Sequence, residues 1–246
     1  MGRRFADLHI RCDFGPGYEG LRELAKRARC LGFSLLAVPL RPGVAREELS
    51  RLKAMAEEEG IDLATRVDLA PRSREELLSA LRRLRRRFEL IGVLCSNKAV
   101  ARVAARDRRV DLLSFPLELR KRFFDEAEAE LASGSSCALE LDMMPLMGLR
   151  SPERVRLLGR LREEVALARE KGVPIIISSG ATEPILMRKP RELAYLASEL
   201  LDLSLEEALD ALSRRPAEMV ERNRAKLRPD FIAPGIRLVR RGTDCP

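Results

Sequence analysis

Short apolar runs alternate along the chain with longer segments in which apolar residues recur at helical spacing. Several runs, such as LLAVPL at 35–40, are continuously apolar, as strands covered by helices on both faces should be. This alternation predicts a parallel sheet whose strands are joined by helices. Strands are predicted at 5–11, 33–40, 62–70, 90–96, 110–116, 137–144 and 173–179.

Helical spacing between these strands predicts helices at 18–31, 45–59, 73–88, 97–106, 121–133 and 151–171. Two consecutive helices, 189–201 and 205–227, then follow the seventh strand, and 231–232 with 236–239 predict a short late strand around Pro234 and Gly235. Seven βα units favour an α/β fold, a TIM-like (β/α) barrel. A doubly wound open sheet is the alternative, but the chain carries neither GxGxxG nor a Walker A sequence. We expect one barrel domain over 1–246, with 228–246 as a C-terminal tail or late strand.

Composition narrows the function classes. Hydrophobic residues make up 46% of the chain and charged residues 34%, which excludes disorder. The net charge is +8, and only seven of the 46 basic residues are lysine, so arginine dominates and suits bidentate phosphate contacts. One histidine and five cysteines without CxxC argue against a multi-histidine or zinc-ribbon metal site. With no signal peptide and no run near the ~18 apolar residues of a membrane span, we expect a cytoplasmic, soluble protein.

Function in a (β/α) barrel sits where the strands end. The predicted ends carry a polar set of mixed sign without a nucleophile–base pair: Asp7, His9, Arg11, Arg66, Asp68, Lys98, Ser114, Glu140, Asp142, Ser178 and Ser179. Asp7-Leu8-His9 resembles the D-x-H-x-H motif of polymerase-and-histidinol-phosphatase (PHP) phosphoesterases, which makes the barrel PHP-like. Arg11 stands where that motif has its second histidine, and a cation there repels a metal. We therefore expect no metal and no catalytic residue.

The alternative hypothesis is a PHP-like metal-dependent phosphoesterase that uses Asp7, His9, Glu140 and Asp142. A third hypothesis is a phosphosugar enzyme whose phosphate site is the turn Ser178–Gly180. Hydroxyls, the backbone N–H groups at Gly180 and the basic pair Arg188–Lys189 together suit an anion, and barrels often bind phosphate after strands seven and eight. A merely well-capped loop is the competing interpretation of this turn.

An arginine run lies on the predicted helix 73–88, at positions 82, 83, 85, 86 and 87. It indicates either a solvated face or a patch for nucleic acid or an acidic partner. Helix 151–171 has a similar number of arginines, but glutamates dilute them.

The C-terminal third, from Pro174 to Asn223, resembles one family, the archaeal and eukaryotic ribonuclease P protein component 3. This family is the TIM-barrel-like protein subunit of that ribonucleoprotein. Its motif runs through S-S-G-A, a spacer, L/M-R-x-P, a helix, and a second helix with S-x-x-P and a downstream Asn. The matching residues are Ser178, Ser179, Gly180, Ala181, Arg188, Pro190, Ser213, Pro216 and Asn223.

The resemblance implies an RNA- and protein-binding scaffold for tRNA processing. In this family RNA is the catalyst that removes the 5′ leader from precursor tRNA, Mg²⁺ serves the RNA, and the isolated protein binds no cofactor and is inactive. The implied partners are RNase P RNA, precursor tRNA, the small Pop-type RNase P component 2 and other RNase P proteins, with no membrane. We expect RNA contacts from Arg188, Lys189, Ser178, Ser179 and Gly180. We also expect them from Arg66, Lys98 and Arg11, on the sole ground that these residues lie at strand ends.

Overall fold

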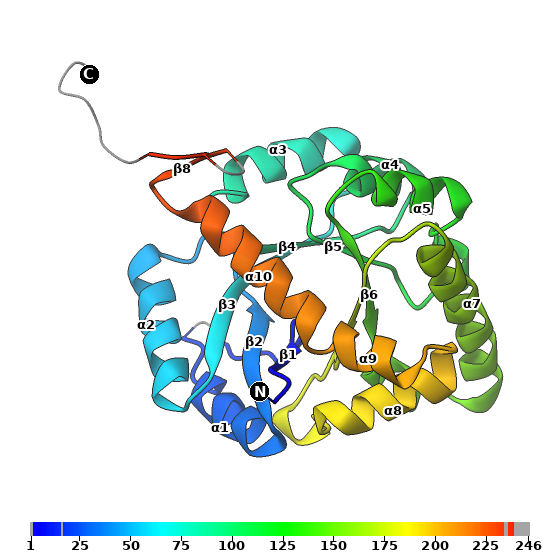
Figure 1. The fold of residues 1–246 in the computed structure, drawn as a ribbon, viewed down its shortest axis with the longest axis horizontal. Helices are drawn as coiled ribbons and strands as arrows, with labels where there is room; N and C mark the ends of the chain where they lie inside the picture. The colour runs from blue at the N-terminus through cyan, green and yellow to red at the C-terminus, as the bar shows by residue number, and fades with distance from the viewer. Residues whose placement is uncertain (1, 16, 234–235, 239–246) are drawn as a thin grey trace.

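A computed structural model describes residues 2–15, 17–233 and 236–238 and shows a ring of strands surrounded by helices (Figure 1). Seven parallel strands pair in chain order in one sheet, which curls into a nearly closed barrel. The predicted TIM-like α/β fold is confirmed. The strands are β1 (Phe5–Asp7), β2 (Phe33–Pro39), β3 (Asp62–Leu69), β4 (Leu90–Leu94), β5 (Leu112–Ser114), β6 (Ala138–Asp142) and β7 (Ile175–Ser178).

Helices follow the strands and form the outer layer. They are α1 (Leu21–Leu31), α2 (Arg46–Glu58), α3 (Arg74–Leu84), α4 (Lys98–Arg106), α5 (Glu126–Ser133), α6 (Met144–Gly148), α7 (Ser151–Glu170), α8 (Pro190–Leu201), α9 (Leu205–Ala211) and α10 (Arg214–Leu227). Two 3₁₀ turns, η1 (Leu119–Lys121) and η2 (Pro184–Leu186), lie in the loops after β5 and β7. The short helix α6 was not predicted. In the described part of the chain, no helix has both the length and the apolar character to cross a membrane.

The predicted helix 205–227 is two helices, α9 and α10, separated at Leu212 and Ser213. Pro216 has no N–H, so it cannot bond the carbonyl of Leu212 four residues earlier. That carbonyl instead accepts a hydrogen bond from Ala6 N of β1 at 2.8 Å. The break therefore attaches the C-terminal helices to the first strand.

The predicted late strand does not join the barrel. β8 (Phe231–Ala233) and β9 (Ile236–Arg237) form a separate antiparallel pair beyond α10, while Pro234, Gly235 and Val239 lie outside the described residues. The seam between β1 and β7 is bridged just after the strands. Gly180 N donates to His9 O at 2.9 Å, and Arg11 N donates to Ala181 O at 2.8 Å.

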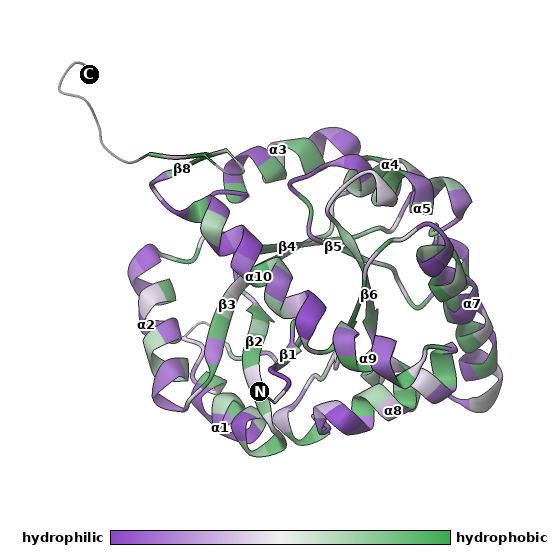
Figure 2. Cartoon of the chain, viewed as in Figure 1, coloured by the Kyte–Doolittle hydropathy of each residue, from purple (hydrophilic) through white to green (hydrophobic). Residues whose placement is uncertain are grey.

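The two ends of the barrel are closed differently. At the end where the strands begin, α10 lies across the opening (Figure 1) and buries Met219 and Val220 against the inward-facing apolar residues of the strands, among them Ala6, Leu90 and Ile176. The outer faces of the surrounding helices are hydrophilic, whereas the strands are largely hydrophobic (Figure 2). At the end where the strands finish, polar side chains from five strands and the loops after them meet inside the barrel. We call this second end the mouth.

Candidate functional site

Arg66 of β3 lies at the centre of the mouth and has no exposed surface. Its guanidinium donates to both carboxylate oxygens of Glu140 of β6, at 2.7 and 2.6 Å, to Asp68 Oδ1 at 2.7 Å and to the Leu8 carbonyl at 2.6 Å. Such a bidentate pair is among the strongest that side chains form. Burial alone would lower the pKa of this arginine and raise that of Glu140, but their mutual attraction keeps both charged.

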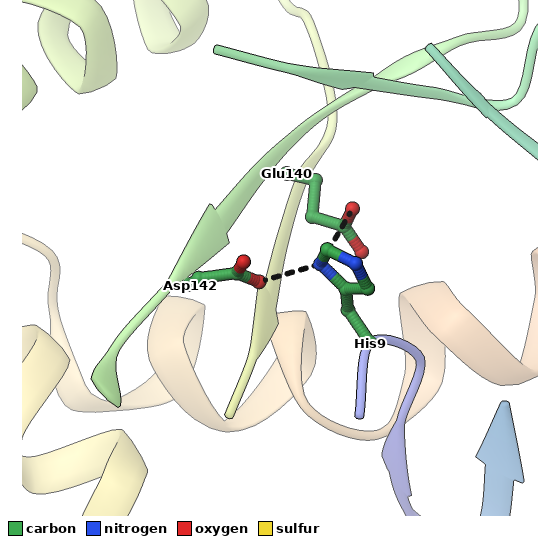
Figure 3. A group of neighbouring side chains, drawn as sticks. All are labelled: His9, Glu140 and Asp142. Atoms are coloured by element: carbon green, nitrogen blue, oxygen red, sulfur yellow. Dashed lines mark hydrogen bonds and ion pairs between the residues drawn. The ribbon is translucent and has the colours of Figure 1, made fainter. Parts of the chain in front are cut away.

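His9, the single histidine, stands beside this pair just after β1. Its Nε2 is 3.1 Å from Asp68 Oδ2. Its Nδ1 is 3.0 Å from Asp142 Oδ1 and 3.6 Å from Glu140 Oε2 (Figure 3). Both ring nitrogens therefore face carboxylates, which favours the imidazolium form. Burial and Arg66 lower the pKa of His9, but Glu140 and Asp142 outweigh them and raise it to about 10.

Two glycines make room for these side chains. Gly92 of β4 pairs in register with Asp68, and a Cβ at Gly92 would lie 2.5 Å from Asp68 Oδ1 and 2.8 Å from an Arg66 nitrogen. Gly180 has φ +64°, and a Cβ there would lie 2.7 Å from Asp142 Cβ. The cluster thus depends on small residues in neighbouring strands and turns.

The donor set at the mouth does not fit a metal ion. One ligand atom each from His9, Glu140 and Asp142 lies within 4.8 Å of the other two, as a metal site would need. However, the Glu140 oxygens already accept the Arg66 guanidinium and the hydroxyls of Ser114 and Ser178, and a protonated His9 offers no lone pair. The Arg66 guanidinium therefore takes up the Glu140 oxygens that a metal ion would need as ligands.

The turn proposed as an anion site is used internally. Ser178, Ser179 and Gly180 are buried. Ser179 N donates to Asp7 Oδ1 at 3.0 Å, Gly180 N donates to His9 O, and Ala181 N donates to the Ser179 hydroxyl. These three N–H groups are therefore not directed at a ligand, and the competing interpretation of a well-capped loop fits the geometry.

Asp7 of β1 receives two of the hydrogen bonds that fix this turn, from His9 N and Ser179 N, through Oδ1. Its Oδ2 is buried without a partner among the described residues. Burial raises the pKa of this carboxyl to about 6, and the hydrogen bonds only partly oppose the rise. Asp7 therefore serves as an internal acceptor that holds β1 against the segment after β7.

The expected RNA contacts divide into buried and accessible residues. Arg66 is buried with Ser178, Ser179 and Gly180, so none of these side chains offers a surface to RNA. The rest lie on the mouth side, on segments that follow strands. Lys189 and Lys98 are exposed, and Arg188 is half-buried, with its guanidinium donating to the carbonyls of Ile185, Leu186 and Met187.

Arg11 is the basic group at the opening itself. It is exposed and lines a cavity of about 530 Å³ whose floor is His9, Asp68 and Asp142 and whose walls are largely apolar. Leu94 and Leu117 stand partly exposed at this cavity's rim.

A second buried polar cluster closes the opposite end, and sequence reasoning missed its role. Asn223 of α10 donates through Nδ2 to Glu89 O at 2.8 Å and to Asp111 Oδ1 at 2.7 Å. Arg224 donates to Glu89 and to both oxygens of Asp62. The sequence did hold a signal for this cluster: Asp62, Glu89 and Asp111 each stand at the start of an apolar strand segment. A carboxylate that is buried there needs a partner.

Comparisons with known proteins extend the resemblance seen over 174–223. A family model described as RNase P subunit p30 matches residues 4–228. The chain is 29% identical over 226 residues to Ribonuclease P protein component 3 of Methanosarcina barkeri and 27% identical over 223 residues to that of Methanosarcina mazei. These alignments cover 92% of both chains and 91% of both chains, respectively.

A chain in a cryo-EM structure of archaeal ribonuclease P with mature tRNA has a similar fold. The TM-score is 0.83 at 20% identity, and the match covers 97% of this chain and 100% of that one. At this identity the likeness supports the nearly closed barrel and nothing finer. The family-model match over residues 4–228 confirms the family that the C-terminal motif indicated.

Proposed function

The chain belongs to the RNase P subunit p30 family and has its role in tRNA processing, and from this premise we propose that it supports the catalytic RNA of ribonuclease P in removing the 5′ leader of precursor tRNA. The observation that carries the proposal is the family match over residues 4–228, nearly the whole barrel. The chain then acts as a scaffold that binds RNA and protein, and the RNA performs the chemistry.

The mouth supports a scaffold. Hydrolysis by a barrel of this kind needs a free base, a nucleophile or a metal at the strand ends. Here Arg66 and His9 are paired with Glu140, Asp68 and Asp142. Because each of these groups already has its partner, the arrangement stabilises the barrel and leaves little for a substrate to engage.

The partners in the proposal are RNase P RNA, precursor tRNA and the small Pop-type RNase P component 2. A chain of similar fold occurs in a structure of archaeal ribonuclease P with mature tRNA, which supports RNase P RNA and tRNA as partners. In this proposal Mg²⁺ serves the RNA, and the protein itself holds no cofactor. The isolated chain is inactive, and the complex is cytoplasmic.

For the mouth side, the proposal keeps Arg188, Lys189, Lys98 and Arg11 as RNA contacts. Lys189, Lys98 and Arg11 are exposed, and Arg188 is anchored by three carbonyls, which holds its guanidinium in one orientation. Arg188 has no carboxylate partner within 4.0 Å among the described residues. A positioned cation of this kind suits a phosphate.

An omission experiment tests the proposed function. Precursor-tRNA cleavage is reconstituted at limiting Mg²⁺ from RNase P RNA and the other RNase P proteins, with and without this chain. We expect a large loss of 5′-leader removal on omission and no cleavage by the protein alone. Equal cleavage with and without the chain contradicts the proposal.

A companion assay addresses the phosphoesterase alternative. The purified chain is analysed for bound metal and assayed for hydrolysis of small phosphoesters, beside Asp7→Ala. We expect no stoichiometric metal, because both carboxylate oxygens of Glu140 are already hydrogen-bonded to Arg66. Metal-dependent hydrolysis lost in Asp7→Ala would favour the enzyme instead.

A further inference from the structure

Exposed arginines without carboxylate partners gather where α3 and α4 end, on the side of the barrel opposite the mouth. Arg82, Arg83 and Arg86 on and just after α3, and Arg106 and Arg108 at the end of α4, are all exposed. Within the part of the chain that the structure describes, none of the five lies within 4.0 Å of a carboxylate oxygen. We call these five residues the α3–α4 basic surface.

The two helices present these arginines on one continuous surface. α3 and α4 lie side by side (Figure 1), and a shallow cavity of about 400 Å³ lies between them. It is lined by Leu78, Val103, Arg106, Asp107 and Arg108, and the Asp107 carboxylate is paired with Arg109, which is not one of the five. Arg82 follows Leu78 by about one helical turn, so it lies on the same side of α3. Arg85 fastens the two helix ends together, because its guanidinium donates to the Arg109 carbonyl and pairs with Asp111.

The end of α10 extends this positive region. Lys226 is exposed, and partial burial, Arg222 and Arg85 lower its pKa, while Asp111 only partly opposes the fall. Cations placed near one another repel each other, and the nearby carboxylates of Asp107 and Asp111 are already paired with Arg109 and Arg85. A helix dipole rewards basic residues in the last turn, but only by about 0.3–1 kcal/mol each at an exposed site. The small gain in stability that these basic residues bring to the fold therefore does not explain why they are gathered here.

α7 shows what an arginine-rich helix looks like when its charges are used within the fold. Arg160 pairs with Glu163 and Glu164, Arg162 with Asp202, and Arg169 with Glu207. α3 carries its two glutamates, Glu75 and Glu76, in the first turn, and its arginine-rich end has none. The two helices therefore differ in pairing, although both are rich in arginine.

We propose that the α3–α4 basic surface binds the phosphate backbone of RNA, as a second contact on the side of the barrel away from Arg188. Guanidinium groups in excess and in a shared groove suit successive phosphates. The neighbouring surface offers no aromatic ring for base stacking among the exposed large side chains, so the contact reads backbone and not sequence. This inference rests on the proposed function and adds the face of the chain that the RNA covers.

The test compares two charge-matched triple variants. Arg82→Gln, Arg83→Gln and Arg86→Gln are combined in one chain, and Arg156→Gln, Arg162→Gln and Arg169→Gln on α7 in the other. Both lose three positive charges, and all six side chains are exposed. Binding to RNase P RNA is measured from 50 to 400 mM salt. We expect the slope of log affinity against log salt to fall by about two to three units for the α3 variant, and by less than one for the α7 variant.

Three results would overturn the inference: equal slopes for wild type and the α3 variant, an equal loss in both variants, or intact RNA binding with loss of a protein partner from the reconstituted complex. The last would assign the surface to an acidic protein. Thermal unfolding of both variants checks the fold. If wild type neither binds the RNA nor supports cleavage, the proposed function itself fails; if wild type does both and the α3 variant matches it, only this surface is wrong.

Discussion

The mouth of the barrel and the α3–α4 basic surface use the same side chain in opposite ways. At the mouth, Arg66 has no exposed surface and is bonded to Glu140, Asp68 and a carbonyl. At the other end, Arg82 and Arg83 are exposed and have no acid partner among the described residues. A buried charge must be paired, whereas an exposed one is solvated and remains available. Arginine content alone therefore does not locate a binding surface, but pairing and burial do.

Removal of the buried arginine should give the largest effect. Arg66→Ala leaves Glu140 buried without its bidentate partner, so we expect the free energy of unfolding to fall by about 3–5 kcal/mol. Urea unfolding followed by circular dichroism measures the change.

Arg82→Ala is the matched control for that variant, because it removes the same side chain from the exposed end. Its effect should stay within about 0.5 kcal/mol. Arg66→Lys should recover part of the loss, since it keeps the charge but cannot bond both oxygens. Similar losses for Arg66→Ala and Arg82→Ala would abolish the distinction between the two ends.

The protonation of His9 gives the next effect, at the mouth alone. Its native pKa is raised to about 10, against about 6.5 in an unfolded chain. Between these values the native state binds the extra proton, so stability is fully present below pH 6.5 and falls as pH rises toward 10. The loss over this window should be at most about 5 kcal/mol.

Because the chain has one histidine, the imidazole resonances in an NMR titration report His9 directly. His9→Gln should remove the corresponding part of the pH dependence of unfolding. A histidine that titrates near pH 6.5 would mean that Asp68 and Asp142 do not hold it as the imidazolium.

The smallest of the three effects concerns the α10 end. Asn223→Ala removes the donor shared by the Glu89 carbonyl and Asp111, which leaves buried acceptors short of a partner. We expect a loss of about 1–3 kcal/mol in chemical unfolding. Glu221→Ala, two residues earlier on the same helix and exposed, is the control and should change stability by less than about 0.5 kcal/mol. Equal effects would mean that Asn223 does not fasten α10 to the strands.

Much of the fold could be predicted because its signals are local. Continuous apolar runs marked seven strands, and helical spacing marked the helices between them. The break inside 205–227 could not be read from spacing, because the apolar pattern runs on while Pro216 and the bond from Ala6 to Leu212 interrupt the backbone. The late strand segments formed at 231–233 and 236–237, but they pair with each other and not with the barrel, because a pairing partner is not encoded in a strand's own pattern.

The candidate site was predicted in membership but not in role. Strand-end position correctly brought His9, Arg66, Glu140 and Asp142 together. Whether Arg66 points outward to RNA or inward to Glu140 depends on strand register and on the space beside Gly92, which are properties of the sheet. The sequence likewise left two interpretations of the turn Ser178–Gly180 open, and the structure favours the well-capped loop because its N–H groups are used by Asp7 and His9, about 170 residues away along the chain.

The sequence by itself determined the alternating architecture, the excess of arginine and, through the motif from Pro174 to Asn223, the family. These depend on residue type and spacing, which a chain carries whether folded or not. Only the tertiary structure decided which charges cancel and which remain. Pairing joins residues such as Arg66 and Glu140, 74 positions apart, and burial then fixes whether a cation stabilises the barrel or stands free to meet an anion.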